Sequence, residues 1–197
     1  TILKRKYSNK FESQVIASNI ETAFVIESVD RDFNLNRFER YLALALDGKI
    51  NAVIVLNKID LISEKALDQK TSQIKNRFHG IEVIPTSTVS EKGYSNLAKY
   101  IRKGQTYCFL GSSGVGKSTF AVNYAIATLV DTKGKVLVAD MDPRACGDLS
   151  LLMGVRPKRT LMELGAAQGR IDANAMMTYV SPHPSGVHFM PSVLEVE

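Results

Sequence analysis

One segment of this 197-residue sequence restricts the fold more than any other. It reads Gly111-Ser112-Ser113-Gly114-Val115-Gly116-Lys117-Ser118, a glycine-rich run that ends in Lys-Ser with the spacing of a phosphate-binding loop. Such a loop needs a strand before it and a helix after it. The sequence predicts both, a strand over 106–110 and an apolar helix over 117–130. We therefore expect a P-loop nucleotide-binding fold.

The residues of this loop have separate chemical tasks. Backbone N–H groups of 111–116, together with the helix start at Ser118 and Thr119, are predicted to bind the nucleotide phosphates. Lys117 can reach the β- and γ-phosphates and is the first candidate catalytic residue. The Ser118 hydroxyl is a candidate ligand of Mg²⁺.

Short apolar runs alternate with helical periodicity along the chain. Strands are predicted at 23–26, 52–56, 81–84, 106–110, 136–139 and 187–190, with helices at 35–46, 63–78, 93–101 and 117–130. This alternation predicts an α/β fold with a mostly parallel, doubly wound sheet. We expect one nucleotide-binding domain over 14–197, which the later strands would complete, preceded by a basic arm over 1–13.

A second motif follows the predicted strand at 52–56. Asn57-Lys58-Ile59-Asp60 lies where that strand ends, which is where ligands bind in open α/β sheets. A carboxylate such as that of Asp60 can accept hydrogen bonds from guanine N1–H and N2–H₂, which adenine does not offer. Asn57, Lys58 and Asp60 are therefore predicted to read the base, and Ser87 to add backbone contacts. GTP or GDP is the expected ligand, with ATP as the alternative.

The base-reading motif precedes the phosphate loop, which is the reverse of the usual order in GTPases. With this circularly permuted order, and with Gln14 to Ile20, Asp32-Phe33-Asn34-Leu35 and Arg40 to Ala45, residues 1–119 resemble the RsgA/YjeQ family of ribosome-biogenesis GTPases. The resemblance implies GTP hydrolysis, a partner in the small ribosomal subunit and its rRNA, and an OB-fold domain of which the basic arm would be a remnant.

The sequence after the loop follows a different pattern. Residues 134–143, 147–154 and 183–191 resemble the ParA/MinD superfamily, especially CpaE-like ATPases of pilus assembly, and this resemblance covers 114–197. It implies that Asp142 orients the attacking water and that Asp140 lies near Mg²⁺, although these two could exchange roles. Ser112 stands where that superfamily has an additional lysine.

The chain is thus predicted to be a hybrid of two P-loop lineages, joined within 111–119. Three functions follow: a guanine-nucleotide-binding protein related to subunit maturation, a ParA-like positioning ATPase that dimerises on nucleotide, or a chimeric nucleotide-binding domain without efficient turnover. The sequence leaves open whether GTP is hydrolysed, because no convincing switch threonine or Asp-x-x-Gly turn follows the loop. No apolar run is long enough to span a membrane, and a cytoplasmic location is expected.

Overall fold

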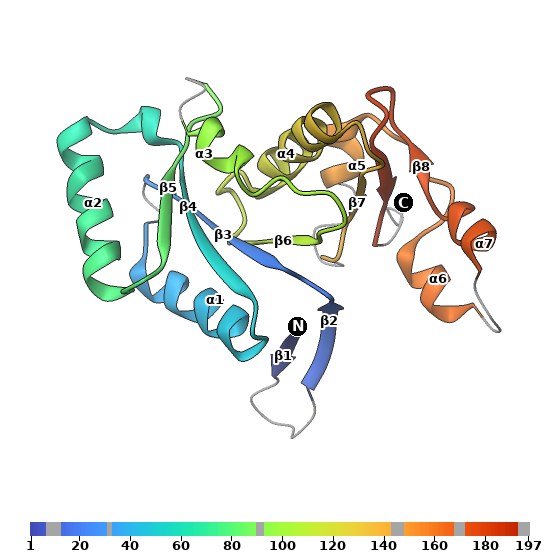
Figure 1. Cartoon of the computed structure of the whole chain (residues 1–197), viewed down its shortest axis with the longest axis horizontal. Helices are drawn as coiled ribbons and strands as arrows, with labels where there is room; N and C mark the ends of the chain where they lie inside the picture. Colours follow the sequence, from blue (N-terminus) through green and yellow to red (C-terminus); the bar gives the residue numbers. More distant parts are fainter. Residues whose placement is uncertain (7–12, 31–32, 90–92, 143–147, 168–171, 193–197) are drawn as a thin grey trace. The chain divides into compact units, whose positions relative to one another are not determined.

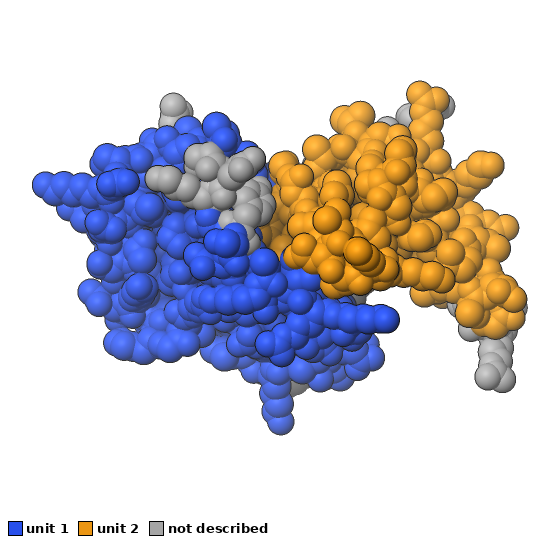
Figure 2. Space-filling model, turned by 45° about the horizontal axis from the view of Figure 1, so that its top comes forward, with its two compact units in different colours: residues 1–117 blue, residues 118–197 orange. Residues whose placement is uncertain are grey.

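The computed structural model describes residues 1–6, 13–30, 33–89, 93–142, 148–167 and 172–192 (Figure 1). The chain divides into two compact units, Thr1–Lys117 and Ser118–Glu197, which are coloured separately in Figure 2. One domain over 14–197 stays a prediction, and each unit is described by itself.

The first unit is built on a four-stranded parallel sheet. Its strands are β3 (Thr22–Ser28), β4 (Asn51–Asn57), β5 (Glu82–Pro85) and β6 (Tyr107–Leu110), in the order β5-β4-β3-β6. Strands β3 and β4 are almost entirely buried, as expected for apolar, β-branched runs in a parallel sheet covered on both faces. Because all four strands run in the same direction, their carboxyl ends lie at one edge. The predicted α/β fold with a parallel sheet is confirmed.

Helices connect these strands and complete the core. Helix α1 (Leu35–Asp47) is capped by the side chain of Asn34 and buries Phe38, Leu42 and Ala45. A short 3₁₀ turn, η1 (Ile59–Leu61), follows β4 and leads to α2 (Glu64–Arg77) and, after β5, to α3 (Tyr94–Ala98). The sequence therefore predicted the three helices correctly in order and type, whereas the turn η1 was not predicted.

The N-terminal residues form a hairpin within the described part of the chain. Strand β1 (Ile2–Lys6) pairs antiparallel with β2 (Ser13–Ser18), and Leu3 is buried in the core of the first unit. Residues 2–6 of the expected basic arm thus form a strand that the buried Leu3 anchors, and the arm over 1–13 as a separate segment stays a prediction.

The second unit begins within α4 (Lys117–Thr132), at Ser118. It contains β7 (Leu137–Ala139), α5 (Asp148–Met153), α6 (Leu161–Ala166), α7 (Ala173–Met177), β8 (Ser181–Pro182) and β9 (His188–Met190). Strand β9 pairs parallel with β7 and antiparallel with β8. A small core forms around Val122, Met153 and Phe189.

Strands β7 and β9 were expected to complete the main sheet. In the described residues they instead form a separate three-stranded sheet, in the order β7-β9-β8. Among the same residues, the helices are too short or too polar for any of them to cross a membrane.

Candidate functional site

The candidate site of the first unit lies at the edge where its parallel strands end. The phosphate loop follows β6, the base-reading motif follows β4, and Ser87 follows β5 (Figure 1). Parallel pairing in register aligns Ser28 with Asn57 at this edge. Segments that lie far apart in the sequence thus come together because every strand presents its carboxyl end there.

The phosphate loop is packed so closely that two of its glycines cannot be replaced without movement. A Cβ at Gly111 would lie 2.4 Å from the carbonyl oxygen of Ile26 in β3. A Cβ at Gly116, where φ is +88°, would lie 2.7 Å from Nδ2 of Asn57. The motif's glycines therefore serve close approach to β3 and β4 as well as the turn itself.

Asn57 fastens the phosphate loop to β4. Its side chain is 2% exposed, and Nδ2 donates a hydrogen bond to the carbonyl oxygen of Val115 at 3.0 Å. Its Oδ1 accepts from the hydroxyl of Thr86 at 3.3 Å. Both ends of the amide are engaged by the protein, so the observed task of Asn57 is to hold the loop. Its contact with a base stays a prediction.

Lys58 makes a second connection to the loop. Its backbone adopts a left-handed conformation with φ of +61°, and Nζ donates to the carbonyl oxygen of Gly114 at 2.8 Å. The same ammonium forms an ion pair with Oδ2 of Asp30 at 3.2 Å. Asp30 is itself oriented by Ser28, whose hydroxyl donates to Oδ1 at 2.5 Å. Lys58 therefore joins the loop after β3 to the phosphate loop.

Asp60 lies in η1 and is exposed to solvent. The buried hydroxyl of Ser87 donates to Oδ1 of Asp60 at 2.5 Å and accepts from the backbone N–H of Val89 at 3.1 Å. This arrangement differs from the sequence expectation in detail, because Ser87 contributes its side chain and acts on Asp60. Its backbone contact with a base stays a prediction. The result is an exposed carboxylate with a fixed orientation at the sheet edge.

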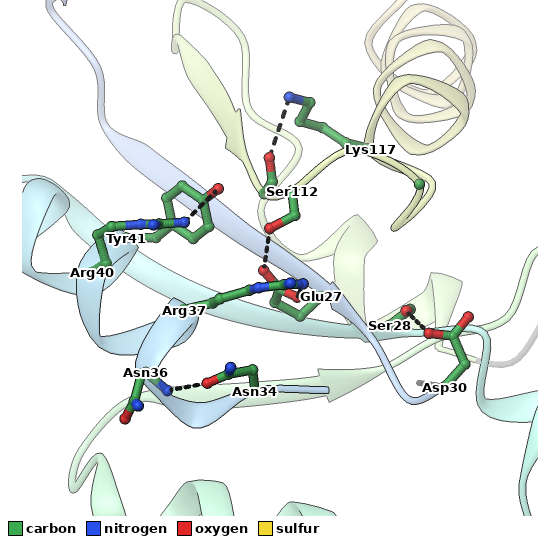
Figure 3. Close-up of polar contacts among 12 residues, drawn as sticks. Glu27, Ser28, Asp30, Asn34, Asn36, Arg37, Arg40, Tyr41, Ser112 and Lys117 are labelled. Carbon is green, nitrogen blue, oxygen red and sulfur yellow. Dashed lines mark hydrogen bonds and ion pairs between the residues drawn. The ribbon is translucent and has the colours of Figure 1, made fainter. Parts of the chain in front are cut away.

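Lys117 folds back over its own loop (Figure 3). Its Nζ donates to the carbonyl oxygen of Gly111 at 3.4 Å. Ser112, at the second position of the loop, donates its hydroxyl to Oε1 of Glu27 at 3.3 Å. Ser113 and Gly114 are exposed at the top of the loop. The backbone that would receive phosphates is thus supported from β3 and accessible from solvent.

The predicted metal ligands and water-orienting group belong to the beginning of α4 and to the second unit. Ser118 and Thr119 lie in the first turn of α4. Asp140 follows β7 and is 7% exposed, and its Oδ1 accepts from the backbone N–H of Asp142 at 3.0 Å. The backbone N–H of Asp140 donates to the carbonyl oxygen of Met190, so the end of β9 holds this turn.

These residues have ligand chemistry suited to Mg²⁺. A serine hydroxyl and a carboxylate supply the oxygen donors that this ion prefers. No group of three or more carboxylate, imidazole or thiol side chains gathers in the described residues. Mg²⁺ usually takes one or two protein ligands and completes its shell with water and phosphates. Ser118 and Asp140 would hold the ion, and its contribution would be to neutralise phosphate charge.

Sequence reasoning missed three residues of this site: Glu27, Asp30 and Thr86. None belongs to a recognised motif, and each is placed by strand order rather than by local sequence. The signal that could have found them is the predicted parallel arrangement of the strands at 23–26, 52–56 and 81–84, because residues near the ends of neighbouring parallel strands lie close together.

Comparison with known proteins identifies a family. The family model described as RsgA GTPase matches residues 1–136. The small ribosomal subunit biogenesis GTPase RsgA of Methanosarcina acetivorans is 43% identical over 106 residues, which is 54% of this chain and 28% of that protein. The protein named RsgA 2 of Vibrio parahaemolyticus is 35% identical over 141 residues, or 72% of this chain and 38% of that protein.

A solved structure, that of YjeQ from Thermotoga maritima, matches with 27% identity and a TM-score of 0.48, covering 54% of this chain and 38% of that one. The chain spans about a third of the length of the curated relatives it matches. Since the family model covers well over half of the sequence, from the N-terminal hairpin through the phosphate loop, the chain belongs to the RsgA GTPase family.

Proposed function

We propose that this chain binds guanine nucleotide at the edge of its parallel sheet and is part of a GTPase that acts in maturation of the small ribosomal subunit. The observation that carries the proposal is the direct bonding of the base-reading motif to the phosphate loop, from Asn57 to Val115 and from Lys58 to Gly114. Two motifs that must contact opposite ends of one nucleotide are thereby held in one rigid arrangement.

Guanine selectivity is proposed for Asp60. Its carboxylate is exposed and oriented by Ser87, so it can accept hydrogen bonds from N1–H and N2–H₂ of guanine. Adenine offers neither of these donors to the carboxylate, so it gains no such hydrogen bonds. We therefore expect GTP and GDP to bind more tightly than ATP.

Phosphate binding is proposed for the loop and for Lys117. The ammonium now bonded to the Gly111 carbonyl would move to the β- and γ-phosphates, exchanging a neutral acceptor for charged ones. Replacing Lys117 with alanine should abolish GDP binding in a fluorescence titration. Lys103→Ala removes an exposed lysine outside the loop and serves as the control. Equal GDP affinity of the Lys117→Ala variant and the wild type would refute the proposal.

Hydrolysis is proposed to be slow without a partner. The Asp131-Thr132-Lys133-Gly134 segment has the letters of a γ-phosphate-sensing turn, but α4 continues to Thr132 and Lys133 has φ of +48° at the helix end. The segment is therefore the ordinary end of a helix, and its resemblance to a γ-phosphate-sensing turn needs no other explanation. GTP turnover should be measured with and without purified small ribosomal subunits. We expect a higher rate with the subunits, and a rate that they do not change would remove the ribosomal part of the proposal.

A second candidate is an ATP-dependent activity of the ParA type, with residues 114–197 derived from that lineage. It is favoured by one observation, the nearly buried Asp140 directly after parallel strand β7, with Asp142 bonded to it. In this candidate Asp142 would orient water and nucleotide would promote a dimer. Asp142→Asn should then abolish ATP turnover while leaving GDP affinity unchanged. Lack of ATP turnover in the wild type would eliminate the candidate.

A further inference from the structure

A carboxylate lies buried beneath the phosphate loop and has no part in the proposed recognition of nucleotide. Glu27 is the next-to-last residue of β3, and its side chain is fully buried. The hydroxyl of Ser112 donates to its Oε1 at 3.3 Å, and Nη1 of Arg37 lies 4.0 Å from its Oε2 (Figure 3). Arg37 comes from α1, and a third of its side chain is exposed.

A charged group in this position is energetically costly. Removing a carboxylate from water is unfavourable unless an opposite charge compensates it, and the serine hydroxyl is neutral. The guanidinium of Arg37 supplies that opposite charge, at the long end of ion-pair distance. Glutamine has the same shape and could still accept the bond from Ser112. The negative charge of Glu27 is therefore not required to hold the loop.

The phosphate loop is a single segment of backbone, and Glu27 contacts it through the hydroxyl of Ser112. Nucleotide phosphates bind to backbone N–H groups of such loops, so Glu27 and the phosphates would be separated by one stretch of backbone. Charges act strongly over such distances in a protein interior, and salt screens them weakly. The residue proposed to read the base, Asp60, belongs to the separate segment after β4.

From this geometry we infer that Glu27 and Arg37 form an opposed charge pair that sets how strongly the phosphate loop binds successive phosphates. Glu27 weakens the binding of the γ-phosphate, and Arg37 offsets that repulsion. Glu27 thereby keeps GTP affinity from rising steeply above GMP affinity, and Arg37 limits how far it does so. This inference rests on the proposed binding of guanine nucleotide by this loop.

The test uses the whole chain and three nucleotides. Affinities for GMP, GDP and GTP are measured by displacement of a fluorescent GDP analogue from the wild type, Glu27→Gln, Arg37→Gln and the double variant. For Glu27→Gln we expect the ratio of GTP to GMP affinity to rise at least about tenfold, because GTP carries about two more unit charges than GMP and each, about 10 Å away at an effective dielectric constant near 20, changes affinity by about tenfold. For Arg37→Gln the ratio should fall by about the same factor. In the double variant it should return to within about twofold of the wild type.

A surface ion pair between α1 and α2 provides matched controls. Arg77 and Glu39 lie 2.5 Å apart, and their side chains are 41% and 60% exposed. Glu39→Gln and Arg77→Gln change the net charge as the test variants do, but at a solvated position where charge effects are screened. Neither should alter the GTP to GMP ratio by more than about twofold.

A change of the GTP to GMP affinity ratio in opposite directions in Glu27→Gln and Arg37→Gln distinguishes this inference from a purely structural role of the two residues. If Glu27 and Arg37 only stabilise the loop, both variants lower GTP affinity, and that result overturns the inference, as does an unchanged ratio in Glu27→Gln. Should Glu27→Gln fail to fold in a thermal melt, Arg37→Gln decides alone: a selective loss of GTP affinity supports the inference, and equal loss for GMP and GTP overturns it. A wild type that binds no guanine nucleotide refutes the proposed function itself, and the charge pair with it.

Discussion

Replacing Asn57 with alanine tests the connection between the base-reading motif and the phosphate loop. The substitution removes the hydrogen bonds to Val115 and Thr86, at 3.0 and 3.3 Å, from a side chain that is 2% exposed. It leaves a backbone carbonyl and a hydroxyl without these partners. At about 1–3 kcal/mol for each buried unpaired group, and with some relief from rotation of the hydroxyl, the loss is about 2–4 kcal/mol.

This loss should appear in two measurements. Urea unfolding followed by circular dichroism should show a free energy of unfolding lower by that amount, and GDP affinity should fall by at least about 30-fold, the equivalent of 2 kcal/mol. Thr86→Val removes only one of the two bonds and should cost about 1 kcal/mol.

Asn51→Ala is the matched control, because it is the same substitution at the exposed first residue of the same strand. Its free energy of unfolding should stay within about 0.5 kcal/mol of the wild type. If Asn57→Ala and Asn51→Ala lose equal stability and equal GDP affinity, the connection through Asn57 does not hold the loop and the reasoning is refuted.

Three further predictions concern the first unit. Gly116→Ala should reduce GDP affinity more than tenfold, because the added Cβ would collide with Asn57. Gly104→Ala is the control: Gly104 also has a positive φ but has open space around it, so the substitution should cost about 1 kcal/mol of stability and leave GDP affinity unchanged. Asp30→Ala releases the lysine it pairs with and should speed GDP dissociation about fivefold in a stopped-flow chase, since a partly exposed ion pair contributes up to about 1 kcal/mol. An unchanged rate would contradict that role. Burial raises the pKa of the Cys108 thiol to about 12, so the folded protein should react slowly with a thiol reagent at pH 8 when the other cysteine is removed by Cys146→Ser. Labelling as fast as in urea would count against the burial. The free energy of unfolding should decline above pH 9.0.

The pH dependence of Cys108 follows from the direction of its shift. The folded state favours the protonated thiol, whose ordinary pKa is 9.0. Stability is therefore complete below that value, where folded and unfolded chains are both protonated, and declines as the unfolded chain releases its proton.

Local patterns predicted the elements around the phosphate loop well. The apolar runs that became β3 and β4 are long enough, and sufficiently rich in β-branched residues, to be recognised without tertiary information. The shorter β6 was recognised because its apolar and aromatic residues directly precede the glycine-rich loop. The positions of Asn57 and Gly111 at strand ends followed directly. Motif residues could thus be assigned because their spacing along the chain reflects the chemistry they perform.

Side-chain partners between strands could not be predicted in the same way. Asp30 and Glu27 have roles only because β3 lies between β4 and β6, an order that periodicity does not specify. The separate pairing of β7 with β9 was missed for the same reason, since strands of three residues carry too little pattern to indicate which sheet they join. Leu3 was assigned to a basic arm because one buried leucine among lysines gives no periodic signal.

Competition between GTP and ATP tests the central claim most directly. A fluorescent GDP analogue bound to the chain in the presence of Mg²⁺ is displaced by increasing amounts of each nucleotide, with the Asp60→Ala variant measured in parallel. We expect GTP to displace the analogue at concentrations at least about a hundredfold lower than ATP, and Asp60→Ala to remove most of this difference. Equal displacement by GTP and ATP from the wild-type chain would contradict the claim.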